Sequence, residues 1–144
     1  MKLFFVLLMM ISVNLCFAQQ DLNGYWKGII THEDGGYTPE YSFELFIIQK
    51  GDSITGRSYV YVDSIYAQMN IKGDVHDGIY LELEDEEILN HEELSKMEWC
   101  IKKYQLKLEQ KDNVLHLEGS WQGKTSFSTC VPGRIYLQKK IPRA

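Results

Sequence analysis

The sequence is poor in the residues and motifs that mark several common classes of protein. It has only three prolines, and none of them interrupts a strand-like segment. It has no long basic stripe and no GxxxxGK[ST] loop, and its 20 acidic and 15 basic residues give a formal charge of −5. A mildly acidic chain without a basic stripe argues against nucleic acid as a partner.

Motifs for metal binding or nucleophilic catalysis are absent as well. The four histidines form neither a His-x-His nor a His-Glu-x-x-His motif, and no Gly-x-Ser-x-Gly elbow is present. We therefore expect no metal, no cofactor and no enzymatic activity, although paired carboxylates need only proximity in space and stay open. A dense acidic cluster lacks the loop that organises calcium ligands, so we interpret it as a solvated rim. It comprises Glu82, Glu84, Asp85, Glu86, Glu87, Glu92 and Glu93.

The first 18 residues have the layout of a secretory signal peptide, with a positive start at Lys2, an apolar run and a small residue at Ala18. The run is shorter than the roughly 20 residues that span a bilayer, which argues against a membrane anchor. Lipidation of Cys16 is a second alternative, but Leu15 is large where that processing needs a small residue. We expect an exported protein, periplasmic or secreted, with membrane association only if Cys16 is lipidated.

The remaining residues, 19–144, are enough for one domain. They retain two of the three cysteines, Cys100 and Cys130. In an oxidising compartment an even pair of cysteines favours a disulfide. The alternative is two buried free thiols.

Apolar residues alternate with polar ones along most of this domain, which is typical of half-buried strands. Residues 85–96 are interpreted as a long connection with at most one helical turn. The fold class predicted is all-β, an antiparallel up-and-down barrel of eight to nine strands, because the segments are joined mostly by short turns. The strand-like segments are residues 24–32, 41–50, 54–62, 66–75, 79–84, 99–109, 114–122, 125–130 and 134–140.

The first of these segments opens with Gly24-Tyr25-Trp26. This tripeptide resembles the opening of the lipocalin-like (calycin) barrels, and the chain is most similar to the lipocalin-like domains of small exported bacterial proteins. The resemblance implies that Gly24 and Trp26 begin the first strand and that the tryptophan plugs the closed end of the barrel. It also implies that a basic side chain of the last strand lies across the ring, with Arg134 as the first candidate and Arg143 as the second.

Arg57, Tyr59 and Tyr61 share one face of a strand because side chains alternate with period two. If this face points inward, the three side chains line a cavity and orient a carboxylate or headgroup of a ligand. If it points outward, they form a surface strip, and the valines on the other face favour this orientation slightly. Trp99 and Trp121 are either core residues or walls of the pocket.

The function expected is non-catalytic binding of a small hydrophobic or amphipathic ligand, because a barrel of eight strands can hold one small molecule. Arg57, Tyr59, Tyr61 and Trp99 are the candidate ligand-binding residues. An apolar cavity above about 300 Å³ would favour this function. The alternative is an interaction or structural protein of the cell envelope, with a filled core and an exposed aromatic patch.

Overall fold

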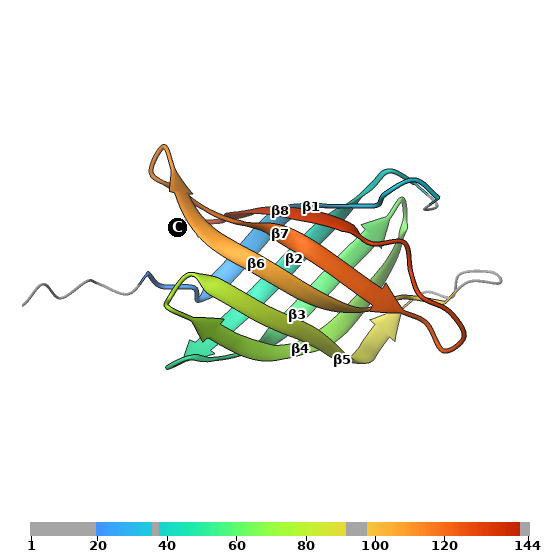
Figure 1. Ribbon diagram of the computed structural model, residues 1–144, viewed down its shortest axis with the longest axis horizontal. Helices are drawn as coiled ribbons and strands as arrows, with labels where there is room; N and C mark the ends of the chain where they lie inside the picture. The colour runs from blue at the N-terminus through green and yellow to red at the C-terminus, as the bar shows by residue number, and fades with distance from the viewer. Residues whose placement is uncertain (1–19, 36–37, 92–97, 142–144) are drawn as a thin grey trace, which may run out of the picture.

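The computed structural model describes residues 20–35, 38–91 and 98–141. The predicted signal peptide with Cys16, the acidic residues Glu92 and Glu93, and Arg143 lie outside these residues. The described chain forms eight strands in a closed barrel (Figure 1). They are β1 (Gly24–Thr31), β2 (Glu40–Lys50), β3 (Ser53–Val62), β4 (Ile65–His76), β5 (Tyr80–His91), β6 (Ile101–Lys111), β7 (Val114–Lys124) and β8 (Gly133–Lys139).

Each strand pairs antiparallel with the next, and β8 pairs with β1 to close the barrel. The alternation of buried and exposed residues follows this pairing, as in β6, where every second residue from Lys102 to Leu108 is buried. Tight turns hold the register. Asp112 and Asn113 both have positive φ, the geometry of the two-residue turns that match the twist of a hairpin. The predicted all-β, up-and-down barrel is therefore confirmed.

Two segments differ from the sequence-based expectation. Residues 125–130 do not form a ninth strand; within them the backbone turns, and only an isolated bridge joins Lys124 to Thr129. Residues 85–91 are not part of a connection but continue β5, with two register irregularities against β4. The acidic side chains concealed this strand, because the alternation that marks a half-buried strand is lost where both faces carry polar residues.

Trp26, the third residue of β1, lies fully buried at the end of the barrel where β1 begins. Its indole nitrogen donates to the carbonyl of Leu22, 2.9 Å away, and Leu22 is itself fully buried. The side-chain oxygen of Asn23 accepts a hydrogen bond of 2.7 Å from the backbone N–H of Gln49. The segment before β1 thus folds across this end and covers the tryptophan.

The cation beside the Trp26 ring is Lys139, with its ammonium 5.8 Å from the ring centroid. The expectation that Arg134 fills this place was wrong: its guanidinium lies over Tyr136. The reason is topological. β1 and β8 run antiparallel, so the end of β8 and not its start meets the beginning of β1, and Lys139 pairs directly with Trp26.

The middle of the barrel is filled by side chains that are at most 2% exposed, among them Phe43, Leu81, Leu106 and Leu117. Phe43 and Tyr104 face each other with ring centroids 5.8 Å apart. Within the described ranges, no helix is long and apolar enough to cross a membrane.

Candidate ligand-binding site

A cavity of about 220 Å³ lies at the end of the barrel opposite Trp26. It forms where β2, β6 and β8 begin and where β3 and β7 end. Its volume is below the 300 Å³ or so that we expected to favour ligand binding, so that expectation is not met and the cavity accommodates only a small molecule. The lining residues are Ile30, His32, Tyr41, Val60, Val62, Glu98, Trp99, Cys100, Lys102, Trp121, Ser128, Thr129, Cys130 and Val131.

One wall of this cavity is a cluster of three rings. His32 packs edge-on against Tyr41 at 4.6 Å between centroids and against Trp121 at 5.1 Å. The Trp121 indole nitrogen is anchored by the carbonyl of Thr31 at 2.9 Å. Edge-on contacts of this kind fix the orientation of rings, so the wall is preorganised for an apolar guest.

The rim of the cavity is tied at two points. Cys100 and Cys130 form the predicted disulfide, with Cα atoms 6.3 Å apart. Ser126 binds the carboxylate of Glu98 through its backbone N–H at 2.9 Å and its hydroxyl at 2.6 Å. These bonds lower the pKa of Glu98 and keep it ionised. The segment before β6 is thereby fixed to the β7–β8 connection.

A buried ion pair lies at the inner end of the cavity. The Lys102 ammonium is 2.8 Å from Oδ2 of Asp85, and the two side chains are 4% and 0% exposed. Lys102 lines the cavity, whereas Asp85 lies behind it. Buried charges are tolerated only when they are paired and hydrogen-bonded, and this pair meets that condition.

The Asp85 carboxylate accepts four hydrogen bonds. Ser58 Oγ at 3.0 Å and the Tyr104 hydroxyl donate to Oδ1, while the backbone N–H at 2.9 Å and the ammonium of Lys102 donate to Oδ2. Burial, followed by the charge of Asp85, raises the pKa of Tyr104 well above its usual value, so the phenol stays a donor. A carboxylate has about four acceptor positions, and all of them are therefore occupied.

The geometry of the sheet explains why Asp85 points inward. The pairing of β5 with β6 begins at Tyr80 opposite Lys107 and ends at Glu84 opposite Lys103. At the next position the Asp85 side chain accepts a hydrogen bond from the backbone N–H of Lys102. β5 pairs with β4 along its whole length, and beyond Glu84 that pairing continues without β6 on the other side. Asp85 thus substitutes for a ladder bond where β5 diverges from β6.

The pKa of His32 is lowered by burial in the folded protein, although its hydrogen bond to Val131 acts in the opposite direction, so the neutral imidazole predominates at neutral pH. Burial is the main cause that lowers its pKa, with a further contribution from the nearby charge of Lys102. Its Nδ1 lies 3.0 Å from the carbonyl of Val131, which can only accept, so Nδ1 carries the proton. Nε2 is then the acceptor nitrogen of the ring.

The structure separates the four candidate ligand residues. Trp99 lines the cavity, but Arg57, Tyr59 and Tyr61 lie on the outer face of β3, because Ser58 and Val60 occupy the buried positions. Arg57 and Tyr59 border a different hollow of about 560 Å³ on the outer wall, beside Tyr25 and other residues of β1–β4.

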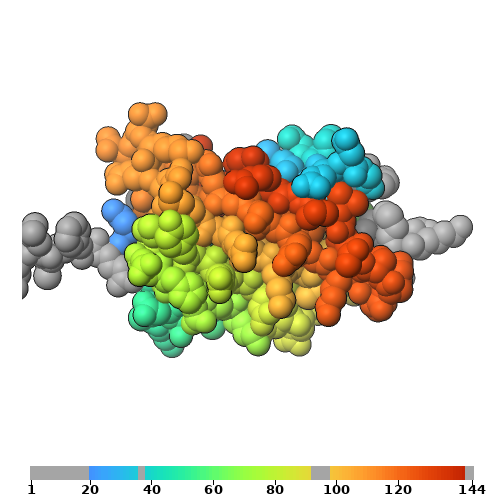
Figure 2. Space-filling model, viewed as in Figure 1, coloured from blue at the N-terminus to red at the C-terminus, as the bar shows by residue number. Residues whose placement is uncertain are grey.

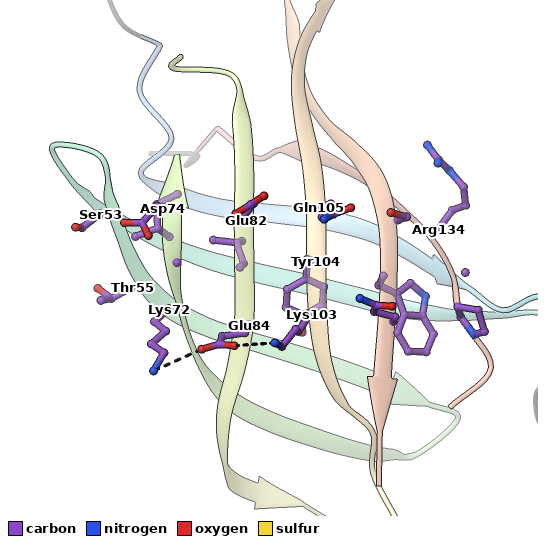
Figure 3. A pocket seen from close by; sticks show the side chains of 18 of the residues that line it. Ser53, Thr55, Lys72, Asp74, Glu82, Glu84, Lys103, Tyr104, Gln105 and Arg134 are labelled. Carbon is purple, nitrogen blue, oxygen red and sulfur yellow. Dashed lines mark ion pairs between the residues drawn. The ribbon is translucent and has the colours of Figure 1, made fainter. Parts of the chain in front are cut away.

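A larger groove of about 880 Å³ crosses the outer face of β3 to β8 and is lined mainly by polar and charged side chains. Figure 3 shows them in rows, with Lys72, Glu84 and Lys103 side by side. Glu84 forms ion pairs with both lysines, at 3.5 and 3.8 Å. Figure 2 shows this wall from outside, with β4 and β5 in green and yellow beside β6 and β7 in orange. Exposed, mutually compensated charges of this kind contribute little binding energy, so the interior cavity is the stronger candidate.

Sequence reasoning missed the roles of Asp85, Lys102 and His32. Asp85 continues the inward face of Leu81 and Leu83, and Lys102 continues that of Tyr104. If the inward-facing positions of each strand are continued by two residues along the chain, Asp85 and Lys102 are both predicted to point into the barrel. No comparable pattern marks His32, because its partner Val131 is distant in the sequence.

In the described residues, no group of three or more histidine, cysteine or acidic side chains could hold a metal ion. No protein-family model matches the chain, and no curated protein matches its sequence.

Proposed function

We propose that this protein binds one small apolar or amphipathic molecule at the open end of its barrel, without catalysing a reaction. The observation that carries the proposal is the interior cavity of about 220 Å³, with its wall of aromatic and aliphatic side chains and its tied rim. Preorganised apolar cavities with a few polar groups are the usual form of small-molecule sites.

We further propose that the barrel belongs with the lipocalin-like domains and that the protein is exported. The order and closure of the eight strands support the first proposal. The disulfide supports the second, because such bonds persist in oxidising compartments. Cleavage after Ala18 would be seen as a mature protein that begins at Gln19.

The function is tested by native mass spectrometry of the protein purified from its own host. A small molecule that is released on denaturation and is absent from a cavity-filled variant, Val60→Phe, would support the proposal. Val60 is 6% exposed and lines the cavity. Val114→Phe is the matched control, because Val114 is 37% exposed in another part of the barrel. A bare mass for wild type, or the same adduct in both variants, would argue against it.

A second function is favoured by a separate observation on the outer wall. Tyr25 and Ile48 are 51% and 40% exposed and lie around the hollow that Phe46, Arg57 and Tyr59 also border. Exposed apolar side chains that adjoin one another are typical of interaction surfaces. In this case the protein acts at the cell envelope through its surface, and Ile48→Thr, but not Val114→Thr, would release it from the envelope fraction.

A further inference from the structure

The charges around the cavity do not favour an anionic ligand. Asp85 neutralises the ammonium of Lys102 at 2.8 Å, and the neutral form of His32 predominates at neutral pH. Glu98 at the rim adds a carboxylate that its bonds to Ser126 keep ionised. The one uncompensated charge among the lining residues is the exposed carboxylate of Glu98 at the rim, so a buried anionic headgroup would find no free positive charge to offset its large desolvation cost.

The Lys102 ammonium nevertheless has one weakly used donor. Two of its three N–H groups go to Asp85 and to the carbonyl of Cys100 at 3.0 Å. The third points to the sulfur of Met69 at 3.5 Å, and a thioether is a weak acceptor. Met69 does not itself line the cavity. An oxygen acceptor at the inner end would therefore draw the ammonium away from the sulfur, and the bond gained would be stronger because it is charge-assisted.

From these contacts we infer that the cavity selects a ligand whose polar end is a neutral hydrogen-bond acceptor, such as a ketone, aldehyde or amide oxygen, bound by Lys102. Carboxylates of the same size are rejected. This inference rests on the proposed function and names the ligand class of the same site.

The volume of the cavity limits the apolar part of the ligand. A dry cavity of about 150 Å³ holds one benzene molecule. The 220 Å³ available here fits a single ring with a short substituent. The edge-on wall of His32, Tyr41 and Trp121 would contact such a ring, and the substituent would carry the oxygen inward to Lys102.

The inference is tested with three probes that have equal numbers of non-hydrogen atoms: acetophenone, α-methylstyrene and benzoate. Their affinities are measured by calorimetry at neutral pH with the whole exported chain. We expect acetophenone to bind about tenfold or more tightly than benzoate. In the paired variant Asp85→Asn with Lys102→Met, acetophenone is expected to weaken by about tenfold while α-methylstyrene changes little.

A second variant keeps the test independent of the fold of the paired variant. Met69→Leu conserves volume and removes the sulfur that competes for the third N–H, so the affinity for acetophenone is expected to rise several-fold and that for α-methylstyrene to stay constant. The inference would be overturned if the affinities for acetophenone and α-methylstyrene changed by the same factor in the variants, or if wild type bound benzoate as tightly as acetophenone. Either result would leave the ligand-binding function in place. If none of the three probes binds to wild type, the inference fails, while the ligand-binding function is decided separately by the native mass spectrometry described above.

Discussion

At the scale of single residues, the carboxylate of Asp85 is tightly constrained. It accepts bonds from Ser58, Tyr104 and both nitrogens of Lys102, and its side chain is 0% exposed. In a low-dielectric interior, a fully satisfied network of this kind rigidifies its surroundings, whereas removal of one member leaves a charge without compensation. The network therefore fixes the inner end of the cavity.

Replacement of Lys102 alone tests this view. Lys102→Met is expected to destabilise the protein by about 3–5 kcal/mol, because Asp85 stays buried and loses its counter-charge. Adding Asp85→Asn is expected to restore most of that loss, because the buried charge is then gone. Urea unfolding of wild type and the single and paired variants measures both changes. Additive losses in the paired variant would show that the two side chains act separately.

His32 gives the folded protein a dependence on pH. Its pKa in the folded state is lowered from 6.5, so the unfolded chain binds a proton more readily. The stability that it contributes is present above pH 6.5 and is lost as the pH falls through the lower folded value. Wild type is expected to lose more stability than His32→Gln between pH 7.5 and pH 5, as measured by urea unfolding. Equal losses would exclude His32 as the cause.

At the scale of elements, the two features that shape the cavity are the divergence of β5 from β6 and the disulfide. The first withdraws Asp85–His91 from β6, so that the inward-facing Asp85 carboxylate accepts the Lys102 N–H in place of a strand partner. The second joins Cys100, just before β6, to Cys130 in the β7–β8 connection. The open end of the barrel is thus cross-linked beside the start of β6, the end of that strand that β5 does not pair with.

Removal of the disulfide is expected to affect stability and the cavity together. Cys100→Ser with Cys130→Ser should lose about 2–4 kcal/mol, because the cross-link closes a long segment of the unfolded chain. It should also raise amide hydrogen exchange around residues 98–102 and 125–131 more than at the Trp26 end. Uniform exchange changes along the barrel would show that the disulfide does not act locally on the rim.

The strands were predictable where one face is apolar and the other polar, as in Tyr104–Leu108 of β6. The same reasoning failed at Asp85–His91, because a strand that is exposed at its end and carries a buried acid shows no alternation of apolar residues. Arg134 was misplaced for a different reason. In the antiparallel barrel the end of β8 lies beside the start of β1, so the residue next to Trp26 is Lys139, whereas Arg134 at the start of β8 lies toward the opposite end.

At the scale of the whole molecule, the barrel has one closed and one open end. Trp26 and Leu22 fill the first, large side chains fill the middle, and the second retains a cavity lined by Trp99 and Trp121. A barrel of eight strands has room for either a filled core or one small ligand. In this barrel the closed end and the middle have a filled core, so an interior ligand has room only at the open end.

The three tryptophans report directly on this division. The central claim is that a small neutral molecule enters the barrel only at the end opposite Trp26, and indole N–H resonances during titration with acetophenone measure it. We predict that the signals of Trp99 and Trp121 shift and saturate together, while that of Trp26, bonded to the Leu22 carbonyl, stays in place. A Trp26 signal that shifts with the others, or Trp99 and Trp121 signals that do not move, would contradict the account.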